Sequence, residues 1–144
     1  METKLQSYLE DLNDNDLTGH LLSEQTLSKY VKVLDVRQET STSSCCFTKA
    51  YTHYAEGTGS VLQHNNTESI DIQFTKYINS GEDVCHLRGL QLRYFTPREV
   101  ANLMGFPVNF SFPTSTTNKT KYRLLGNSLN VKVVAVLYKM LMAK

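Results

Sequence analysis

The chain has 144 residues, 40% of them hydrophobic, which fits one domain with a modest core. Its formal net charge of +1 excludes a strongly basic or acidic protein, so any nucleic-acid contact surface must be local. Cys45, Cys46 and Cys85 form no Cys-x-x-Cys pair, so we expect neither a metal site nor a disulfide framework, and a reducing cytoplasm or nucleus fits.

The N-terminal part of the chain predicts two short helices. The first has apolar residues at helical spacing and ends at the polar run 13–16; these residues are Leu5, Tyr8, Leu9 and Leu12. The second has Ser23 as its N-cap and Leu22 with Leu27 as a hydrophobic staple. Its apolar stripe consists of Leu27, Tyr30, Val31 and Leu34.

The middle of the chain is harder to interpret. Residues 45–63 are rich in aromatic residues and glycine, which predicts loops and short strands. Within 64–82, the alternation of Ile70, Ile72 and Phe74 favours a strand, whereas the spacing of Ile70, Phe74 and Tyr77 favours a helix, and both remain open. Residues 90–94 alternate between apolar and polar and predict a strand.

The clearest local signal predicts a helix from Pro97 to Met104. Thr96 can cap it, Pro97 suits its first position, and Glu99 completes a Thr-x-x-Glu capping box. Gly105 stands where a helix commonly ends in a left-handed residue. We therefore expect Thr96, Glu99 and Gly105 to be structural residues.

The last predicted helix, residues 130–142, is apolar on most of its circumference. Only a narrow line through Lys132 and Lys139 is polar. Such a helix is normally enclosed in a larger core. Either a partner surface lies outside this chain, or the helix is the centre of a self-contained domain. It is too short to span a bilayer, and we expect no membrane contact.

Three segments resemble conserved parts of the cytosine-C5 methyltransferases. Residues 93–99, Arg-Tyr-Phe-Thr-Pro-Arg-Glu, continue through Gly-Phe-Pro at 105–107 and resemble the ninth conserved block. Residues 122–129, Tyr-Arg-Leu-Leu-Gly-Asn-Ser-Leu, resemble the tenth block. Residues 46–51, Cys-Phe-Thr-Lys-Ala-Tyr, resemble the Cys-Phe-Thr signature of the branch that modifies tRNA-Asp, which usually has glycine where Ala50 stands.

The resemblance implies an α+β fold that is a partial unit. Residues 1–113, with the ninth block at 93–107, would be a target-recognition lobe of helices and short strands. Residues 114–144 would carry the tenth block and the C-terminal helix of an otherwise missing Rossmann-like methyltransferase domain. That missing N-terminal catalytic half would be the partner of this chain.

The family's catalytic groups do not occur in this sequence. The nucleophile in the family is the cysteine of a Pro-Cys dipeptide, assisted by the glutamate of a Glu-Asn-Val block. Here no proline precedes a cysteine, and no Glu-Asn-Val is present. Because thiolate addition to C6 activates C5 of cytosine for methyl transfer, we expect no catalytic residue and no activity of the chain alone.

The resemblance also implies two contact sites. Asn127, Ser128 and Leu129 would touch the methionine end of S-adenosyl-L-methionine, beside the N-terminus of the last helix, where N–H groups favour an anion. N-capping explains the same residues, and one edge of a pocket would bind cofactor weakly or not at all. RNA contact near the flipped base is implied for Cys46, Phe47, Thr48, Lys49 and Tyr51, with a core strand as the alternative.

The complete enzyme would transfer a methyl group from S-adenosyl-L-methionine to a tRNA cytosine, in the cytoplasm or the nucleus. This chain would contribute target RNA recognition and one edge of the cofactor pocket. The rival interpretation is a non-catalytic module that binds RNA or a protein. A third interpretation is a chain that does not fold stably.

Overall fold

The computed structural model describes residues 2–143, and this part of the chain combines helices with one small sheet. The α-helices are α1 Asp14–His20, α2 Glu24–Tyr30, α3 Ile70–Asn79, α4 Pro97–Leu103, α5 Asn118–Gly126 and α6 Val131–Met142. The 3-10 helices are η1 Leu5–Tyr8, η2 Val31–Val33 and η3 Val84–Leu90. The strands are β1 Val36–Arg37, β2 Val61–Gln63 and β3 Leu92–Tyr94. The mixed helix-and-sheet content is as predicted.

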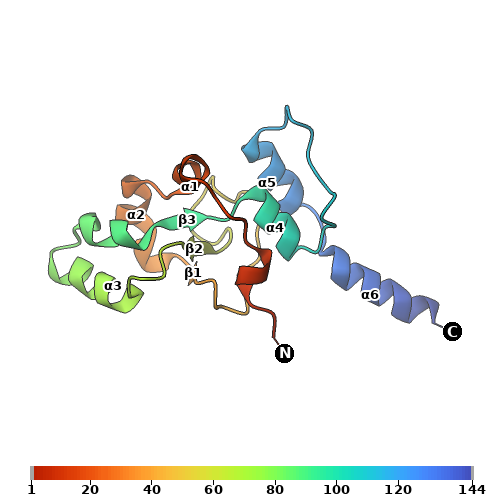
Figure 1. The fold of residues 1–144 in the computed structure, drawn as a ribbon, viewed down its shortest axis with the longest axis horizontal. Coiled ribbons are helices and arrows are strands. Elements are labelled where there is room, and N and C mark those ends of the chain that lie inside the picture. The colour runs from red at the N-terminus through yellow and green to blue at the C-terminus, as the bar shows by residue number, and fades with distance from the viewer. Residues whose placement is uncertain (1, 144) are drawn as a thin grey trace.

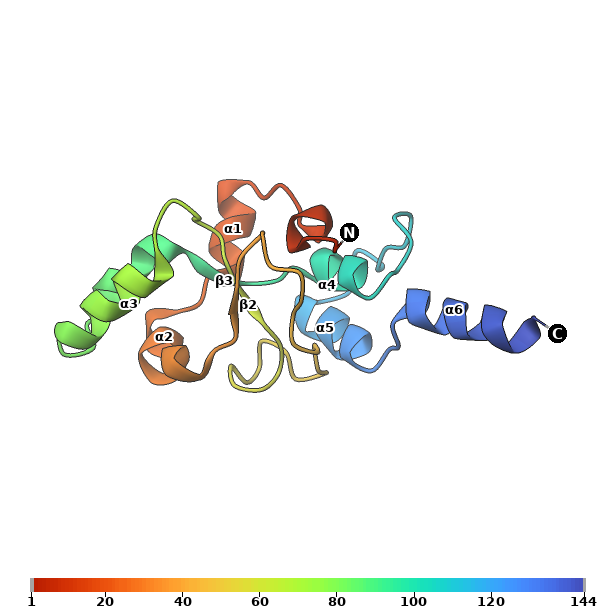
Figure 2. The ribbon, with the colours of Figure 1, turned by 90° about the horizontal axis from the view of Figure 1, so that it is seen from below.

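The sheet lies in the middle of the body, with α2 and α3 towards one end and α4 and α5 towards the other (Figures 1 and 2). Its order is β1-β2-β3, with β2 parallel to β1 and antiparallel to β3. Successive strand residues face opposite sides of a sheet. Val61 and Leu62 of β2 accordingly belong to two different cores.

Each core joins segments that are distant in the sequence. The core beside α4 and α5 contains Leu5, Phe47, Tyr51, Leu62, Phe95, Val100, Ala101, Tyr122 and Leu125. The core beside α2 and α3 contains Leu22, Leu27, Val31, Val61, Tyr77, Leu87, Leu90 and Leu92. Tyr122 and Leu125 of α5 therefore pack with residues from before position 113. The division at 113/114 stays a prediction about the complete enzyme.

The first predicted helix, at residues 5–12, was only partly correct, and the second predicted helix was confirmed as α2. Residues 5–8 form only a 3-10 helix, and the polar run 13–16 begins α1 instead of ending a helix. The reason is capping, because the Asn13 side chain accepts the Asp16 N–H at 3.0 Å. In α2, the Ser23 hydroxyl accepts the Thr26 N–H at 3.1 Å, as its role of N-cap requires.

The ambiguous segment 64–82 contains α3, so the helical spacing was the correct interpretation there. Ser69 caps the helix. Tyr77, which belongs to the helical pattern, is buried on the inner face of α3. Ile72, which belongs only to the strand pattern, is 57% exposed. The predicted strand at 90–94 is β3, which begins at Leu92. Strand β1 and helices α1 and α5 were not predicted.

Helix α4 has the predicted capping box. The Thr96 hydroxyl accepts the Glu99 N–H at 3.1 Å, and the Glu99 carboxylate accepts the Thr96 N–H at 2.9 Å. Gly105 follows the helix with φ of 77°. The N–H groups of Gly105 and Phe106 donate to Asn102 and Ala101, each at 3.0 Å, which is the Schellman pattern.

Helix α6 projects from the body and carries the C-terminus away from it (Figures 1 and 2). Its first turn is attached, because the Val131 N–H donates to the Met104 carbonyl at 2.8 Å. Beyond that turn no described residue of α6 is buried. The interpretation of this helix as the centre of a self-contained domain was therefore wrong.

Taken as one stretch, Asn118–Met142 is long and apolar enough to cross a membrane, and 6% of its most apolar window is buried. The stretch is nevertheless two helices separated by the turn at residues 127–130. With 12 residues, α6 is about 18 Å long, well short of a hydrocarbon core of about 30 Å. Length and composition alone are weak evidence of a span, and the absence of membrane contact stays a prediction.

Candidate cofactor edge and RNA-contact segment

The two segments predicted to contact cofactor and RNA lie against each other. Gly126, the last residue of α5, packs on the backbone of Thr48 and Lys49. A Cβ at position 126 would lie 2.1 Å from the Lys49 nitrogen and 2.2 Å from the Thr48 carbonyl carbon. Only glycine fits such an approach, because neither backbone atom can move independently of the chain. The Gly-Asn-Ser step and the Cys-Phe-Thr-Lys segment thus share one junction.

Phe47 and Tyr51 of the predicted RNA-contact segment are in the core. They are 7% and 3% exposed, and their ring centroids lie 5.0 Å apart in an edge-on arrangement. The Tyr51 hydroxyl donates to the Ser60 carbonyl at 2.6 Å and accepts the Phe95 N–H at 3.0 Å. Burial raises the pKa of Tyr51 well above its ordinary value. The burial of these two rings fits the core alternative, although the segment forms turns and not the strand that this alternative expected.

The other members of the segment can be reached from solvent. Cys46 and Lys49 are exposed and Thr48 is half-buried. Their contact with RNA stays a prediction. Ala50, where the family signature usually has glycine, is not among the residues with positive φ, so the substitution creates no backbone strain.

The helix ends around the predicted cofactor edge differ from those that the sequence predicted. Asn127 and Ser128 close α5, because their N–H groups donate to the Arg123 and Leu125 carbonyls at 3.2 and 3.0 Å. Helix α6 is capped instead by Asn130, whose side chain accepts the Val133 N–H at 3.1 Å. N-capping of the last helix by Asn127 or Ser128, the alternative interpretation of these residues, was therefore wrong, because they close the unpredicted helix α5.

What the cofactor edge offers is side-chain surface. Asn127 is exposed, Leu129 is 71% exposed, and the Ser128 hydroxyl donates to the Leu125 carbonyl at 2.7 Å. This surface can contact a bound molecule on one side, but it does not enclose such a molecule. Contact with S-adenosyl-L-methionine at these residues stays a prediction.

The ninth block contains a buried ion pair whose burial was not foreseen. Arg93 and Glu99 are 1% and 0% exposed. Their guanidinium and carboxylate meet through two hydrogen bonds of 2.8 and 2.9 Å. Glu99 also accepts the Glu10 N–H at 3.0 Å. Arg93 therefore fixes β3 to the start of α4.

A second ion pair, between Asp35 and Arg37 at β1, lies near the Cys-Phe-Thr segment. Asp35 accepts hydrogen bonds from the Arg37 guanidinium, at 2.9 Å from Nε, and from the buried Ser60 hydroxyl at 2.5 Å. Ser60 in turn accepts the Cys45 N–H at 2.7 Å. The hydrogen bond from Arg37, partly opposed by desolvation and assisted by Ser60, lowers the pKa of Asp35 to about 2.

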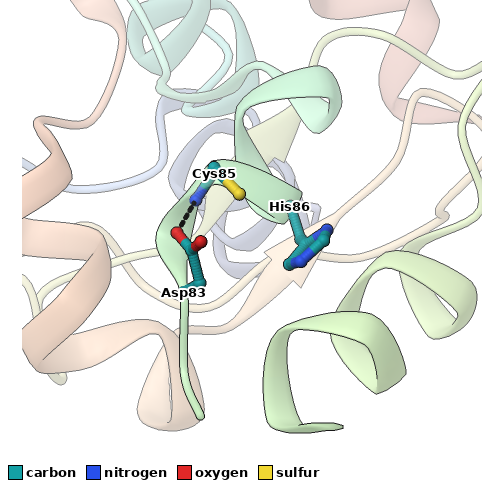
Figure 3. Close-up of side chains that lie close together, drawn as sticks. All are labelled: Asp83, Cys85 and His86. Atoms are coloured by element: carbon teal, nitrogen blue, oxygen red, sulfur yellow. Dashed lines mark hydrogen bonds between the residues drawn. The ribbon is translucent and has the colours of Figure 1, made fainter. Parts of the chain in front are cut away.

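Among the residues that the structure describes, Asp83, Cys85 and His86 form a group whose side chains could hold a metal ion (Figure 3). Their ligand atoms all lie within 4.8 Å of one another. However, Asp83 already caps η3 by accepting the Cys85 N–H at 2.9 Å. Its carboxylate also raises the pKa of the Cys85 thiol, which opposes the thiolate form that a metal needs. Capping explains the arrangement, and the absence of a metal stays a prediction.

Comparison with known proteins adds independent findings. Residues 2–143 match the family model of C-5 cytosine-specific DNA methylases. A human tRNA (cytosine(38)-C(5))-methyltransferase is 48% identical over 139 residues, which are 95% of this chain and 35% of that protein. The chain therefore spans about a third of the length of this curated relative.

Two solved structures have the same fold over nearly the whole chain. The S. pombe Dnmt2 methyltransferase superposes with a TM-score of 0.83 at 40% identity, covering 97% of this chain and 42% of that one. A Spodoptera frugiperda DNMT2 mutant gives 0.82 at 41% identity, covering 96% and 42%. The chain thus belongs to the C-5 cytosine-specific DNA methylase family and matches a region of its Dnmt2-type, tRNA cytosine-38 methyltransferase members.

Proposed function

We propose that this chain supplies target RNA recognition and one edge of the cofactor pocket of an S-adenosyl-L-methionine-dependent tRNA cytosine-C5 methyltransferase. Residues 1–113 act as the target-recognition lobe, and α6 packs on the Rossmann-like catalytic domain of the same enzyme. The chain alone transfers no methyl group, because it contains neither a Pro-Cys nor a Glu-Asn-Val.

The bare apolar surface of α6 carries this proposal. Seven of its large apolar side chains are more than half exposed: Val133, Val136, Leu137, Tyr138, Met140, Leu141 and Met142. Continuous apolar surface of this kind typically marks an interface in a soluble protein. The helix follows the Gly-Asn-Ser step directly, so a domain that covers α6 also faces the cofactor edge. A catalytic domain of this family is the partner that meets both conditions.

The substrate follows from the relatives and from the junction at Gly126. The human relative is named for methylation of cytosine 38 in tRNA. In this chain the exposed Lys49 lies beside the cofactor edge at Gly126, where a target base and a methyl donor have to meet. Exposed free cysteines are compatible with the reducing cytoplasm or nucleus, which we propose as its location.

Complementation tests the proposal. The chain is mixed with the part of the S. pombe Dnmt2 methyltransferase that it does not cover, and transfer of labelled methyl groups to tRNA is measured. We expect neither piece to act alone and the mixture to methylate tRNA. A Leu137→Asp variant removes activity by placing a charge on the apolar face, whereas Lys139→Gln, on the same helix, retains it.

Other outcomes distinguish the alternatives. Turnover by the isolated chain, or tight binding of S-adenosyl-L-methionine to it, contradicts the shared pocket. Binding of tRNA without restored activity favours a non-catalytic RNA-binding module. A thermal melt followed by circular dichroism tests whether the chain folds, and a cooperative transition excludes an unstable product.

A further inference from the structure

Two buried tyrosine hydroxyls bind the backbone of the same residue, Phe95, which lies between β3 and α4. The Tyr51 hydroxyl accepts the Phe95 N–H at 3.0 Å. The Tyr122 hydroxyl donates to the Phe95 carbonyl at 2.6 Å. Phe95 is 0% exposed, so both of its backbone groups depend on partners inside the protein. The two tyrosines are these partners.

Each tyrosine is also attached to one side of the junction at Gly126. The Tyr51 N–H donates to the Thr48 carbonyl at 3.0 Å, which closes the end of the predicted RNA-contact segment. Tyr122 lies one helical turn before Gly126 in α5. Because Gly126 packs on the backbone of Thr48, the contacts return to their starting point. We call this closed set of contacts, which begins and ends at Phe95, the tyrosine network.

The tyrosine network has no group that is free to react. The rings of Tyr51 and Tyr122 are buried and edge-on, with centroids 5.3 Å apart. Burial raises the pKa of both hydroxyls above the ordinary value, so both keep their protons at neutral pH. Each hydroxyl already donates its proton, Tyr51 to the Ser60 carbonyl and Tyr122 to the Phe95 carbonyl. Any part that they take in a reaction is therefore geometric.

The two sides of the network lead to the two predicted contact sites. One side continues into the exposed Lys49 of the RNA-contact segment, and the other continues into the exposed Asn127 of the cofactor edge. Methyl transfer needs the target carbon and the methyl group to be aligned at a short distance, and a displacement of about 1 Å can slow a reaction about a hundredfold. A network that fixes this separation matters more for the transfer step than for the binding of either molecule.

We propose that Tyr51 and Tyr122 are positioning residues for methyl transfer. Their hydroxyls hold the RNA-contact segment and the cofactor edge at a fixed separation, and neither hydroxyl touches the reacting atoms. The inference rests on the proposed function, because it takes Lys49 and Asn127 as parts of the two contact sites. Loss of either hydroxyl accordingly slows transfer without weakening the binding of RNA or cofactor.

Phenylalanine substitutions test the inference, because they remove the hydroxyl and keep the ring. Chains with Tyr51→Phe or Tyr122→Phe are complemented with the remaining part of the S. pombe Dnmt2 methyltransferase, and kcat and KM are measured for tRNA and S-adenosyl-L-methionine. We expect kcat to fall about tenfold in each variant, with both KM values within about twofold of the wild type. The double variant should lose less than the product of the two single losses, because one open contact already frees the network.

Two controls separate positioning from stability. Tyr77→Phe removes the hydroxyl of a tyrosine buried in the other core and should leave kcat unchanged. Val31→Ala deletes two methyl groups from that same core and should destabilise the chain about as much as the loss of a buried hydrogen bond. Its kcat per assembled complex, with assembly measured by size-exclusion chromatography, should match the wild type. A loss of kcat equal to that of the tyrosine variants overturns the inference.

Hydrogen exchange in the isolated chain gives a readout that needs no methyl transfer. The amide protons of Tyr51 and Asn127 are hydrogen bonded beside the junction and should exchange about tenfold faster in both tyrosine variants. The amide proton of Gln73 in α3 should keep its rate. Unchanged exchange at the junction overturns the inference. Faster exchange with unchanged kcat also overturns it, and leaves the proposed function intact. If the wild-type mixture transfers no methyl groups, both fail.

Discussion

The body of the molecule and helix α6 contain the same kinds of apolar residues in opposite environments. Leu125, near the end of α5, is 2% exposed and packs with Phe95 and Tyr122, whereas Leu141 on α6 is 73% exposed. The body also has buried polar groups that hydrogen bond to one another, as in the Arg93–Glu99 pair. The apolar side chains of the body are therefore buried within this chain, whereas those of α6 are not.

The largest effect is expected at the buried ion pair of the body. Replacing Arg93 by Met should lower the free energy of unfolding by about 3–5 kcal/mol, because it leaves the Glu99 carboxylate buried without its partner. Urea denaturation followed by circular dichroism measures this. Arg88→Met is the matched control, because its ion pair with Glu24 is exposed and should change stability by less than about 1 kcal/mol. Equal effects of the two variants would contradict the comparison.

The junction at Gly126 should give the next largest effect. A methyl group there meets backbone atoms of Thr48 and Lys49, so Gly126→Ala should destabilise the chain by about 1–3 kcal/mol through overpacking. Gly19→Ala in α1 is the control, because no atom lies within 4 Å of the added Cβ. That variant should be stabilised by about 0.5–1 kcal/mol through helix propensity. A tolerated alanine at 126 would show that the two segments are not rigidly joined.

Acid titration should reveal a smaller contribution from Asp35. Its pKa is about 2 in the folded chain and 3.8 ordinarily, so the ionised form stabilises the fold above about pH 4. This contribution is lost as the pH falls through about 2. Allowing for the partial exposure of the pair, it amounts to about 1–2 kcal/mol. Asp35→Asn should remove this part of the difference in stability between pH 6 and pH 2, and an unchanged pH dependence would contradict it.

The contrast between local and tertiary signals explains which features the sequence could predict. Helices α2 and α4 were found because their N-caps, Ser23 and Thr96, act within one turn and can be recognised in a short segment. Helix α5 also has a capping threonine, Thr117, followed by Tyr122 and Leu125 at helical spacing. Its many polar residues obscured that signal, so the sequence did not show that Asn127 and Ser128 close α5.

The contacts that define the candidate site are not local. Arg93 lies in strand β3 and Glu99, six residues later, lies in helix α4. Their side chains meet only because the strand and the helix come together at Thr96, and the burial of Arg93 depends on this arrangement. The approach of Gly126 to Lys49 joins residues separated by more than half of the chain. Neither follows from spacing or composition. In contrast, the apolar circumference of the last helix was visible in the sequence and correctly predicted an incomplete enclosure.

The smallest effect is expected on α6, and it is the most informative about the comparison. Leu141→Gln should change the stability of the isolated chain by less than about 0.5 kcal/mol, because the side chain is already largely in water. Leu125→Ala in the body should cost about 2–5 kcal/mol. In the complemented enzyme, however, Leu141→Gln should weaken association, since the same leucine is then buried against the catalytic domain. A large loss of stability in the isolated chain would mean that α6 folds back on the body in solution, and the surface assigned to the catalytic domain would then already be covered.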